Sequence, residues 1–134
     1  MTEPTVRERP LSPHLQIYRP MLTMVMSITN RITGGALYFG MALFVLWLAA
    51  AASGPNAFAT VQAVYGSWLG LLILIGFTWA LMLHTLAGIR HLIWDMGLGL
   101  DLKSIEWGAV AVLTGSIVLT LALWLYVLLR GAPT

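Results

Sequence analysis

One histidine lies deep within a long apolar stretch of the sequence. From Ile32 to Ile89 no Asp, Glu, Lys or Arg occurs, and His84 lies inside this stretch. On a helix it would lie about 9 Å deeper than Arg90, since each residue rises about 1.5 Å. An imidazole at that depth is costly, so it is a candidate functional group. Two interpretations are open: a neutral imidazole hydrogen-bonded to a neighbouring helix, or an axial ligand of haem iron.

Residues that follow His84 at helical spacing support its interpretation as a haem ligand. Gly88 lies one turn further on the same face, where its lack of a side chain would offer a smooth wall to a flat macrocycle. Close helix packing would explain the same glycine. His91 lies two turns along, next to Arg90, and cationic donors there are suited to haem propionates. The pattern is consistent with a b-type haem and leaves the packing interpretation open.

A second candidate constellation lies earlier in the chain. Ser27 and Arg31 are four residues apart, so a helix places both on one face. A hydroxyl and a guanidinium beside an apolar wall suit a ligand with a carbonyl or carboxylate head. The alternative is a capping serine and an arginine that extends to the membrane surface. We interpret Gly34 and Gly35 as residues that allow close helix–helix contact.

The elements that position these residues follow from composition. The chain has 134 residues, of which 59% are hydrophobic and 9% charged. A soluble domain carries about a quarter charged residues, so this chain lacks the polar surface that water requires. It has no cysteine, which excludes disulfides and iron–sulfur ligation by the chain itself. The net charge of +2 is small, and its placement at the membrane surface predicts a lipid partner rather than nucleic acid.

The uncharged stretch is too long for one crossing, which takes about 20 residues. A turn-forming cluster at residues 52–56 (ASGPN) divides it. The predicted fold class is an all-α integral membrane protein of three transmembrane helices. We expect an N-terminal arm with the start of the first helix at 1–31, a membrane domain at 32–134, and spans at 32–52, 63–93 and 107–129.

The basic residues predict the orientation in the membrane. Six of the seven lie in the arm or near the second connection, and the first connection has none. The positive-inside rule therefore predicts a cytoplasmic N-terminus and a periplasmic C-terminus. The arm contains acidic residues and no apolar run before Met21, unlike a targeting peptide. We therefore expect a retained arm and a multi-pass protein of a bacterial inner membrane.

Histidine placement constrains any haem that this chain binds. A bis-histidine haem needs two histidines at matching depth on facing helices. His14 lies in the arm, and His91 shares a helix face with His84 about 10.5 Å away at about 1.5 Å per residue. They cannot hold opposite faces of one iron. The second ligand must come from another chain, either a symmetric copy or a different subunit.

Three segments resemble a known family. The segment from His84 to Gly97 (HTLAGIRHLIWDMG) resembles the second-helix motif of the cytochrome b membrane-anchor subunit of succinate dehydrogenase, respiratory complex II. Segments 9–14 (RPLSPH) and 27–34 (SITNRITG) resemble the family's amino-terminal and first-helix motifs. The second-helix motif is long and specific, whereas the third predicted span is generic.

The resemblance implies a function and site residues. The family anchors a flavoprotein and an iron–sulfur protein, together with a second small membrane subunit, and passes electrons from succinate to ubiquinone. It implies that His84 is an axial ligand of one haem b, shared with a histidine of the second anchor subunit. Arg31 and His91 would approach its propionates, and Ser27 and Arg31 would line the quinone site. No residue of this chain is expected to be catalytic.

One position departs from the family pattern. Asn30 stands where the family commonly has histidine, and an amide cannot carry protons at neutral pH. The resemblance also leaves two alternatives: an anchor of quinol–fumarate reductase, or a haem-free anchor in which His84 is a packing residue.

Overall fold

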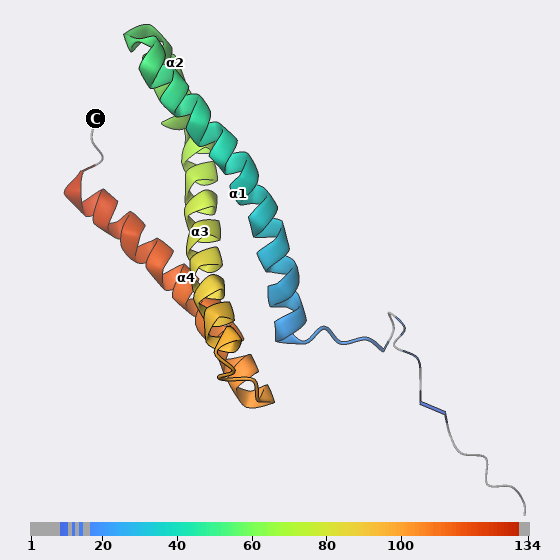
Figure 1. Cartoon of the computed structure of the whole chain (residues 1–134). Coiled ribbons are helices and arrows are strands. Elements are labelled where there is room, and N and C mark those ends of the chain that lie inside the picture. The colour runs from blue at the N-terminus through green and yellow to red at the C-terminus, as the bar shows by residue number, and fades with distance from the viewer. Residues whose placement is uncertain (1–8, 11, 13, 15–16, 132–134) are drawn as a thin grey trace, which may run out of the picture.

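The computed structural model describes residues 9–10, 12, 14 and 17–131, and the first part of the predicted arm, 1–8, lies outside this range. The described part folds into four helices (Figure 1): α1 (Leu22–Ser53), α2 (Pro55–Tyr65), α3 (Trp68–Asp95) and α4 (Leu102–Arg130). Within that part, α1, α3 and α4 are the helices long and apolar enough to cross a membrane. The predicted all-α fold with three membrane spans is confirmed.

Helix α1 begins ten residues before the apolar span predicted at 32–52. Met21 caps it in an extended conformation directly after Pro20, and no proline follows until Pro55. Absence of charge therefore marks the part of the chain that suits lipid, whereas helical hydrogen bonding continues through Asn30 and Arg31. At about 1.5 Å per residue, the 32 residues of α1 extend about 48 Å.

Helix α2 is a short element that folds back along the end of α1. The chain turns at Gly54, whose φ of 120° favours glycine, within the predicted turn cluster. The Tyr65 hydroxyl then donates to the Leu43 carbonyl at 2.7 Å, and Trp47 Nε1 donates to Gln62 Oε1 at 3.2 Å. These two bonds hold α1 and α2 as a helical hairpin.

Local caps explain two further differences from the predicted spans. The span predicted at 63–93 starts inside α2 and crosses a break at residues 66–67, where the Ser67 hydroxyl accepts a bond from the Gly70 amide and starts α3. Helix α4 starts five residues before the span predicted at 107–129, because Asp101 caps it by accepting from the Ser104 amide at 3.0 Å. Hydropathy does not detect either cap.

Helix α3 lies between α1 and α4 and carries most of the packing. The buried core joins small and branched side chains, Leu83 and Ala87 of α3 with Ala109 and Val112 of α4, and the unbranched Met26 of α1 packs against them. Trp79 Nε1 adds a bond across the α3–α4 seam to Ser116 Oγ at 3.1 Å. Toward its C-terminal end, α4 diverges from the other helices (Figure 1).

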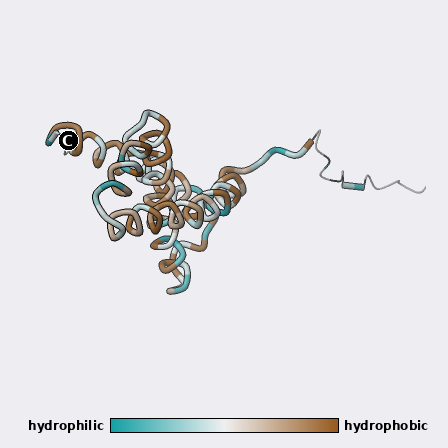
Figure 2. Tube along the Cα trace, turned by 90° about the horizontal axis from the view of Figure 1, so that it is seen from above, coloured by the Kyte–Doolittle hydropathy of each residue, from teal (hydrophilic) through white to brown (hydrophobic). Residues whose placement is uncertain are grey.

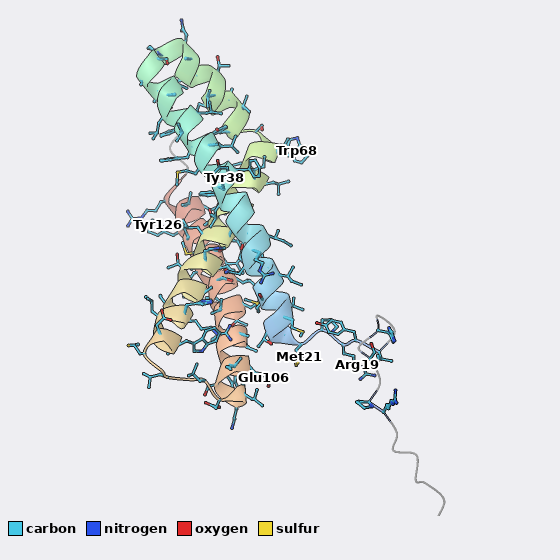
Figure 3. All side chains as sticks on the ribbon, turned by 45° about the vertical axis from the view of Figure 1, so that its right-hand side comes forward. Arg19, Met21, Tyr38, Trp68, Glu106 and Tyr126 are labelled. Atoms are coloured by element: carbon cyan, nitrogen blue, oxygen red, sulfur yellow. The ribbon has the colours of Figure 1, made fainter. Side chains whose placement is uncertain are left out.

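Most of the remaining surface is apolar, as lipid contact requires. Hydrophobic residues cover the outside of the helices along their length (Figure 2). Tyr38, Trp68 and Tyr126 project outward from three different helices (Figure 3), and all three are exposed. An exposed surface of this kind would be a liability in water and is the expected one in a bilayer.

Hydroxyl side chains within the helices are largely satisfied by their own backbone. Each bonds a carbonyl three or four residues earlier, a pattern that hides its polarity without a partner helix. The residues are Thr29, Thr33, Ser53, Thr60, Thr78, Thr85, Thr114, Ser116 and Thr120.

Candidate functional site

The His84 side chain on α3 is half-buried and faces α1. Its Nδ1 atom lies 3.1 Å from the Thr33 hydroxyl oxygen, and Thr33 is buried. This is a hydrogen bond between two transmembrane helices. Nothing in the sequence singles out Thr33 for this role, because threonine in an apolar helix ordinarily bonds its own backbone.

The second ring nitrogen of His84, Nε2, lies beside Gly34. A Cβ atom added at Gly34 would come within 3.3 Å of Nε2 and 3.5 Å of Cε1. A larger residue would therefore crowd this nitrogen, whereas glycine leaves it free. Among the residues that the structure describes, no hydrogen bond to Nε2 is present. Gly34 also permits the close approach of α1 and α3 that we expected of it.

Gly88 and His91 lie on the same side of α3 as His84, nearer its C-terminal end. Gly88 is exposed, and a Cβ there would meet nothing within 4 Å in the described structure. Helix packing within this chain therefore does not explain Gly88. His91 is exposed, and its Nδ1 lies 2.7 Å from the Ala87 carbonyl. A carbonyl only accepts, so Nδ1 carries the proton and Nε2 remains available.

Arg90 is turned away from this face. Its guanidinium donates to the Ile105 carbonyl at 2.8 Å and lies 4.2 Å from the centre of the Trp94 ring. A side chain at Gly108 would meet Arg90 Nε at 3.0 Å. Arg90 thus holds the start of α4 against α3. Neighbours on a helix point in different directions, so its adjacency to His91 does not make it a donor to the same ligand.

Ser27 and Arg31 are exposed on α1 and lie toward its N-terminal end. Arg31 precedes Gly34 by three residues, so it lies on the same side of α1 as the glycine beside His84. Since α1 and α3 run in opposite directions, Ser27 and Arg31 lie toward the end of the bundle where α3 bears Gly88 and His91. These four residues lie on the two helices that meet at His84, where Thr33 and Gly34 of α1 contact its ring.

The Asn30 side chain, at the position that departs from the family pattern, is half-buried. Its Oδ1 atom is buried and has no partner among the described residues. It is thus an available acceptor one turn before Thr33.

Comparison with known proteins identifies the family. Residues 5–123 match the family described as "Succinate dehydrogenase/Fumarate reductase transmembrane subunit". The chain belongs to this family. It is similar to the succinate dehydrogenase cytochrome b556 subunit of Paracoccus denitrificans, with 50% identity over 111 residues, covering 83% of this chain and 85% of that protein. The corresponding subunit of Rickettsia conorii is 35% identical over 117 residues, covering 87% and 91%.

A mitochondrial relative extends the comparison. The succinate dehydrogenase cytochrome b560 subunit of Sus scrofa is 43% identical over 109 residues, covering 78% of this chain and 63% of that longer protein. The resemblance found in the sequence motifs is therefore confirmed: the chain is a cytochrome b-type membrane-anchor subunit of succinate dehydrogenase. It is a multi-pass membrane component of an enzyme complex.

Proposed function

We propose that this subunit binds one haem b through His84 and contributes Ser27 and Arg31 to a ubiquinone site. The observation that carries the haem assignment is the environment of His84, in which Thr33 holds one ring nitrogen and Gly34 leaves the other free. The cytochrome b names of the relatives support it. We therefore assign this deep imidazole to haem ligation rather than to helix packing.

The surrounding residues fit a haem. Gly88 offers open surface on the ligand face of α3, and the Nε2 atom of His91 is available further toward the end of the helix. Arg31 is an exposed cation on the adjoining side of α1. His91 and Arg31 would hold the propionates, and Gly88 would lie along the macrocycle. When bound, the haem supplies a one-electron carrier whose potential the protein sets.

The second axial ligand would come from a partner. His14 lies in the arm before α1, and His91 is two turns from His84 on one helix. We assign the missing ligand to a histidine of a second small membrane-anchor subunit. An iron–sulfur subunit and a flavoprotein subunit complete the proposed complex. The chain expressed alone should show no bis-histidine spectrum, and coexpression with the second anchor subunit should restore it; such a spectrum from the chain alone would indicate a homodimer.

The quinone site would use hydrogen bonding and charge rather than covalent chemistry. The Ser27 hydroxyl would donate to a quinone carbonyl, and the Arg31 guanidinium would stabilise the negative charge that develops on the head group as it is reduced. Neither side chain transfers a proton readily at neutral pH. We assign no proton-delivery role to Asn30, since its amide does not titrate.

The proposed location is a bacterial inner membrane with a cytoplasmic N-terminus. The start of α1 and the α3–α4 connection lie at one end of the described structure, where Met21 and Glu106 are both found (Figure 3), and the C-terminal end of α4 lies toward the other (Figure 1). A cysteine at Ser53 should react with a membrane-impermeant reagent from outside, and one at Ser104 only after lysis. The reverse pattern would contradict this orientation.

Replacing His84 tests the haem assignment. We expect His84→Leu to abolish the low-spin bis-histidine spectrum of the purified complex, while Thr85→Val retains it. Thr85 is the matched control because it adjoins His84 on α3 but is exposed, and its hydroxyl bonds only the Leu81 carbonyl of its own helix among the described residues. A normal spectrum in His84→Leu would refute the assignment and favour the haem-free anchor.

The direction of turnover distinguishes a succinate dehydrogenase anchor from the remaining alternative, an anchor of quinol–fumarate reductase. The family includes fumarate reductase subunits, whereas the relatives named above are succinate dehydrogenase subunits. We therefore propose succinate oxidation as the physiological direction. Comparing succinate–quinone with quinol–fumarate rates of the purified complex tests this choice.

A further inference from the structure

We infer that Thr33 is a positioning residue that sets the tautomer of His84 and the electron-donating strength of its free nitrogen. The consequences of this inference for haem rest on the proposed function, whereas its structural basis is independent of haem. The basis is a chain of two hydrogen bonds that runs from the His84 ring through the Thr33 hydroxyl to the backbone of α1.

The direction of this chain follows from counting hydrogen atoms. The Thr33 hydroxyl has one hydrogen and lies 2.8 Å from the Thr29 carbonyl and 3.2 Å from the Asn30 carbonyl. Carbonyls only accept, so this hydrogen is committed to the backbone. The distance of 2.8 Å is typical of O–H···O, and the 3.1 Å to His84 Nδ1 falls in the N–H···O range.

The imidazole must then supply the other hydrogen. With the Thr33 hydrogen directed at the backbone, its oxygen offers a lone pair to His84, and Nδ1 is the protonated nitrogen. The neutral ring therefore has an unprotonated Nε2, the atom that Gly34 leaves uncrowded. Two adjacent residues of α1 thus act on the two nitrogens of one ring: Thr33 orients Nδ1, and Gly34 gives space at Nε2.

Such a bond changes the ligand as well as orienting it. A hydrogen bond donated by the non-ligating nitrogen raises the basicity of the ligating one, and loss of such a partner typically weakens metal binding about 10- to 100-fold. A more basic ligand stabilises the oxidised iron. We therefore expect Thr33 to strengthen haem binding and to lower the midpoint potential.

The tautomer can be measured without haem. Nitrogen-15 NMR of histidine-labelled, haem-free full-length chain in lipid bilayers distinguishes a protonated Nδ1 from a protonated Nε2. We expect His84 to be protonated on Nδ1 in the wild type and to become a mixture of tautomers in Thr33→Val. A wild-type ring protonated on Nε2 would overturn the inference.

The consequence for haem is measured in the intact complex. Thr33→Val should weaken haem retention about 10- to 100-fold. It should also raise the midpoint potential of the haem, by about 59 mV for each factor of ten by which the lost bond favoured the oxidised over the reduced state. Thr33→Ser should restore both, because it keeps the hydroxyl. Thr29→Val is the matched control, since the Thr29 hydroxyl bonds only the Val25 carbonyl of its own helix among the described residues.

The outcomes separate this inference from the proposed function. Wild-type haem affinity and potential in Thr33→Val, or an equal change in Thr29→Val, would contradict the role of Thr33 while leaving His84 as a ligand. Retention of haem in His84→Leu would instead contradict the proposed function, and the NMR measurement would still decide the tautomer.

Discussion

Helix α3 presents two faces whose polar groups are satisfied in different ways. On the face toward α4, Leu83 is fully buried, Trp79 bonds Ser116, and the Arg90 guanidinium bonds the Ile105 carbonyl. On the other face, His84 bonds Thr33 through one nitrogen and leaves the second without a partner among the described residues. Gly88 and His91 lie exposed beyond it.

The difference shows which polar residues of a membrane helix are structural. The polar ends of the Trp79 and Arg90 side chains donate hydrogen bonds to another helix of the same chain. His84 retains ligating capacity at a depth where an unsatisfied group is costly, so a further partner is expected there. Substitutions on the α4 face should change stability, whereas substitutions on the His84 face should change function.

The largest expected effect comes from replacing Arg31, and the same replacement at Arg90 provides the comparison. Arg31→Leu should reduce quinone reduction by the complex on the order of 10²-fold, the effect of removing a donor that stabilises developing charge. Succinate oxidation with a soluble artificial acceptor should persist, because the complex still assembles. Arg90→Leu should instead lower the stability of the complex and spare the quinone reaction per assembled complex. Equal loss of both activities in Arg31→Leu would mean that Arg31 serves assembly.

The next largest expected effect is on stability, and it compares a buried with an exposed leucine of α3. Leu83→Ala should destabilise the chain by about 2 kcal/mol, the low end of the range for buried leucines, because lipid is as apolar as the protein interior. Leu92→Ala, at an exposed position of the same helix, should stay within about 0.5 kcal/mol of wild type. Unfolding in mixed detergent micelles measures both. Similar losses in the two variants would contradict the assignment of the buried face.

The bond from Trp79 to Ser116 should contribute less again. Trp79→Phe removes the indole donor and keeps an aromatic ring, so we expect a loss of about 0.6 kcal/mol, the average for hydrogen bonds between membrane helices. Ser116→Ala should give a similar loss, and the double variant should be no worse than either single one. Additive losses would indicate that the two residues do not act through their mutual bond.

The smallest effect lies outside the membrane, at the start of α4. Hydrogen bonds from the Ser104 side chain and backbone hold the pKa of the Asp101 carboxyl below its usual range. A depressed pKa in the folded state means that the stabilisation is present above the unfolded pKa and is lost as pH falls through the folded one. Acidification should therefore weaken the cap in the wild type but not in Asp101→Asn. Thermal unfolding between pH 7 and mildly acidic pH compares them, and parallel curves would refute the contribution.

Much of the fold could be predicted from the sequence, because lipid imposes simple requirements on composition. The long uncharged stretch with its turn cluster at 52–56 predicted the three membrane spans that the structure shows. Helix ends were less predictable, since Ser67 and Asp101 act through single hydrogen bonds that hydropathy averages do not detect. Helix α2 is separate because the turn at Gly54 divides it from α1 and the break at residues 66–67 divides it from α3.

The candidate site could be predicted in its residues but not in its connections. His84 was identified by its depth, which needs no knowledge of its neighbours. The roles of Thr33 and Arg90 depend on which helix lies opposite each of them, and residue spacing along one helix does not contain that information. The one available signal was that Thr33 adjoins Gly34, where a small residue lets another helix approach.

The hydroxyl groups that bond their own helix have a consequence for biogenesis. A segment whose serines and threonines already satisfy themselves presents little unpaired polarity when it first leaves the translocon. Thr78, Thr85 and Thr114 are satisfied in this way before any other helix is in place. These hydroxyls therefore add little to the cost of inserting α3 and α4, and the polar groups that still need a partner after insertion are those that bond between helices, such as His84 and Trp79.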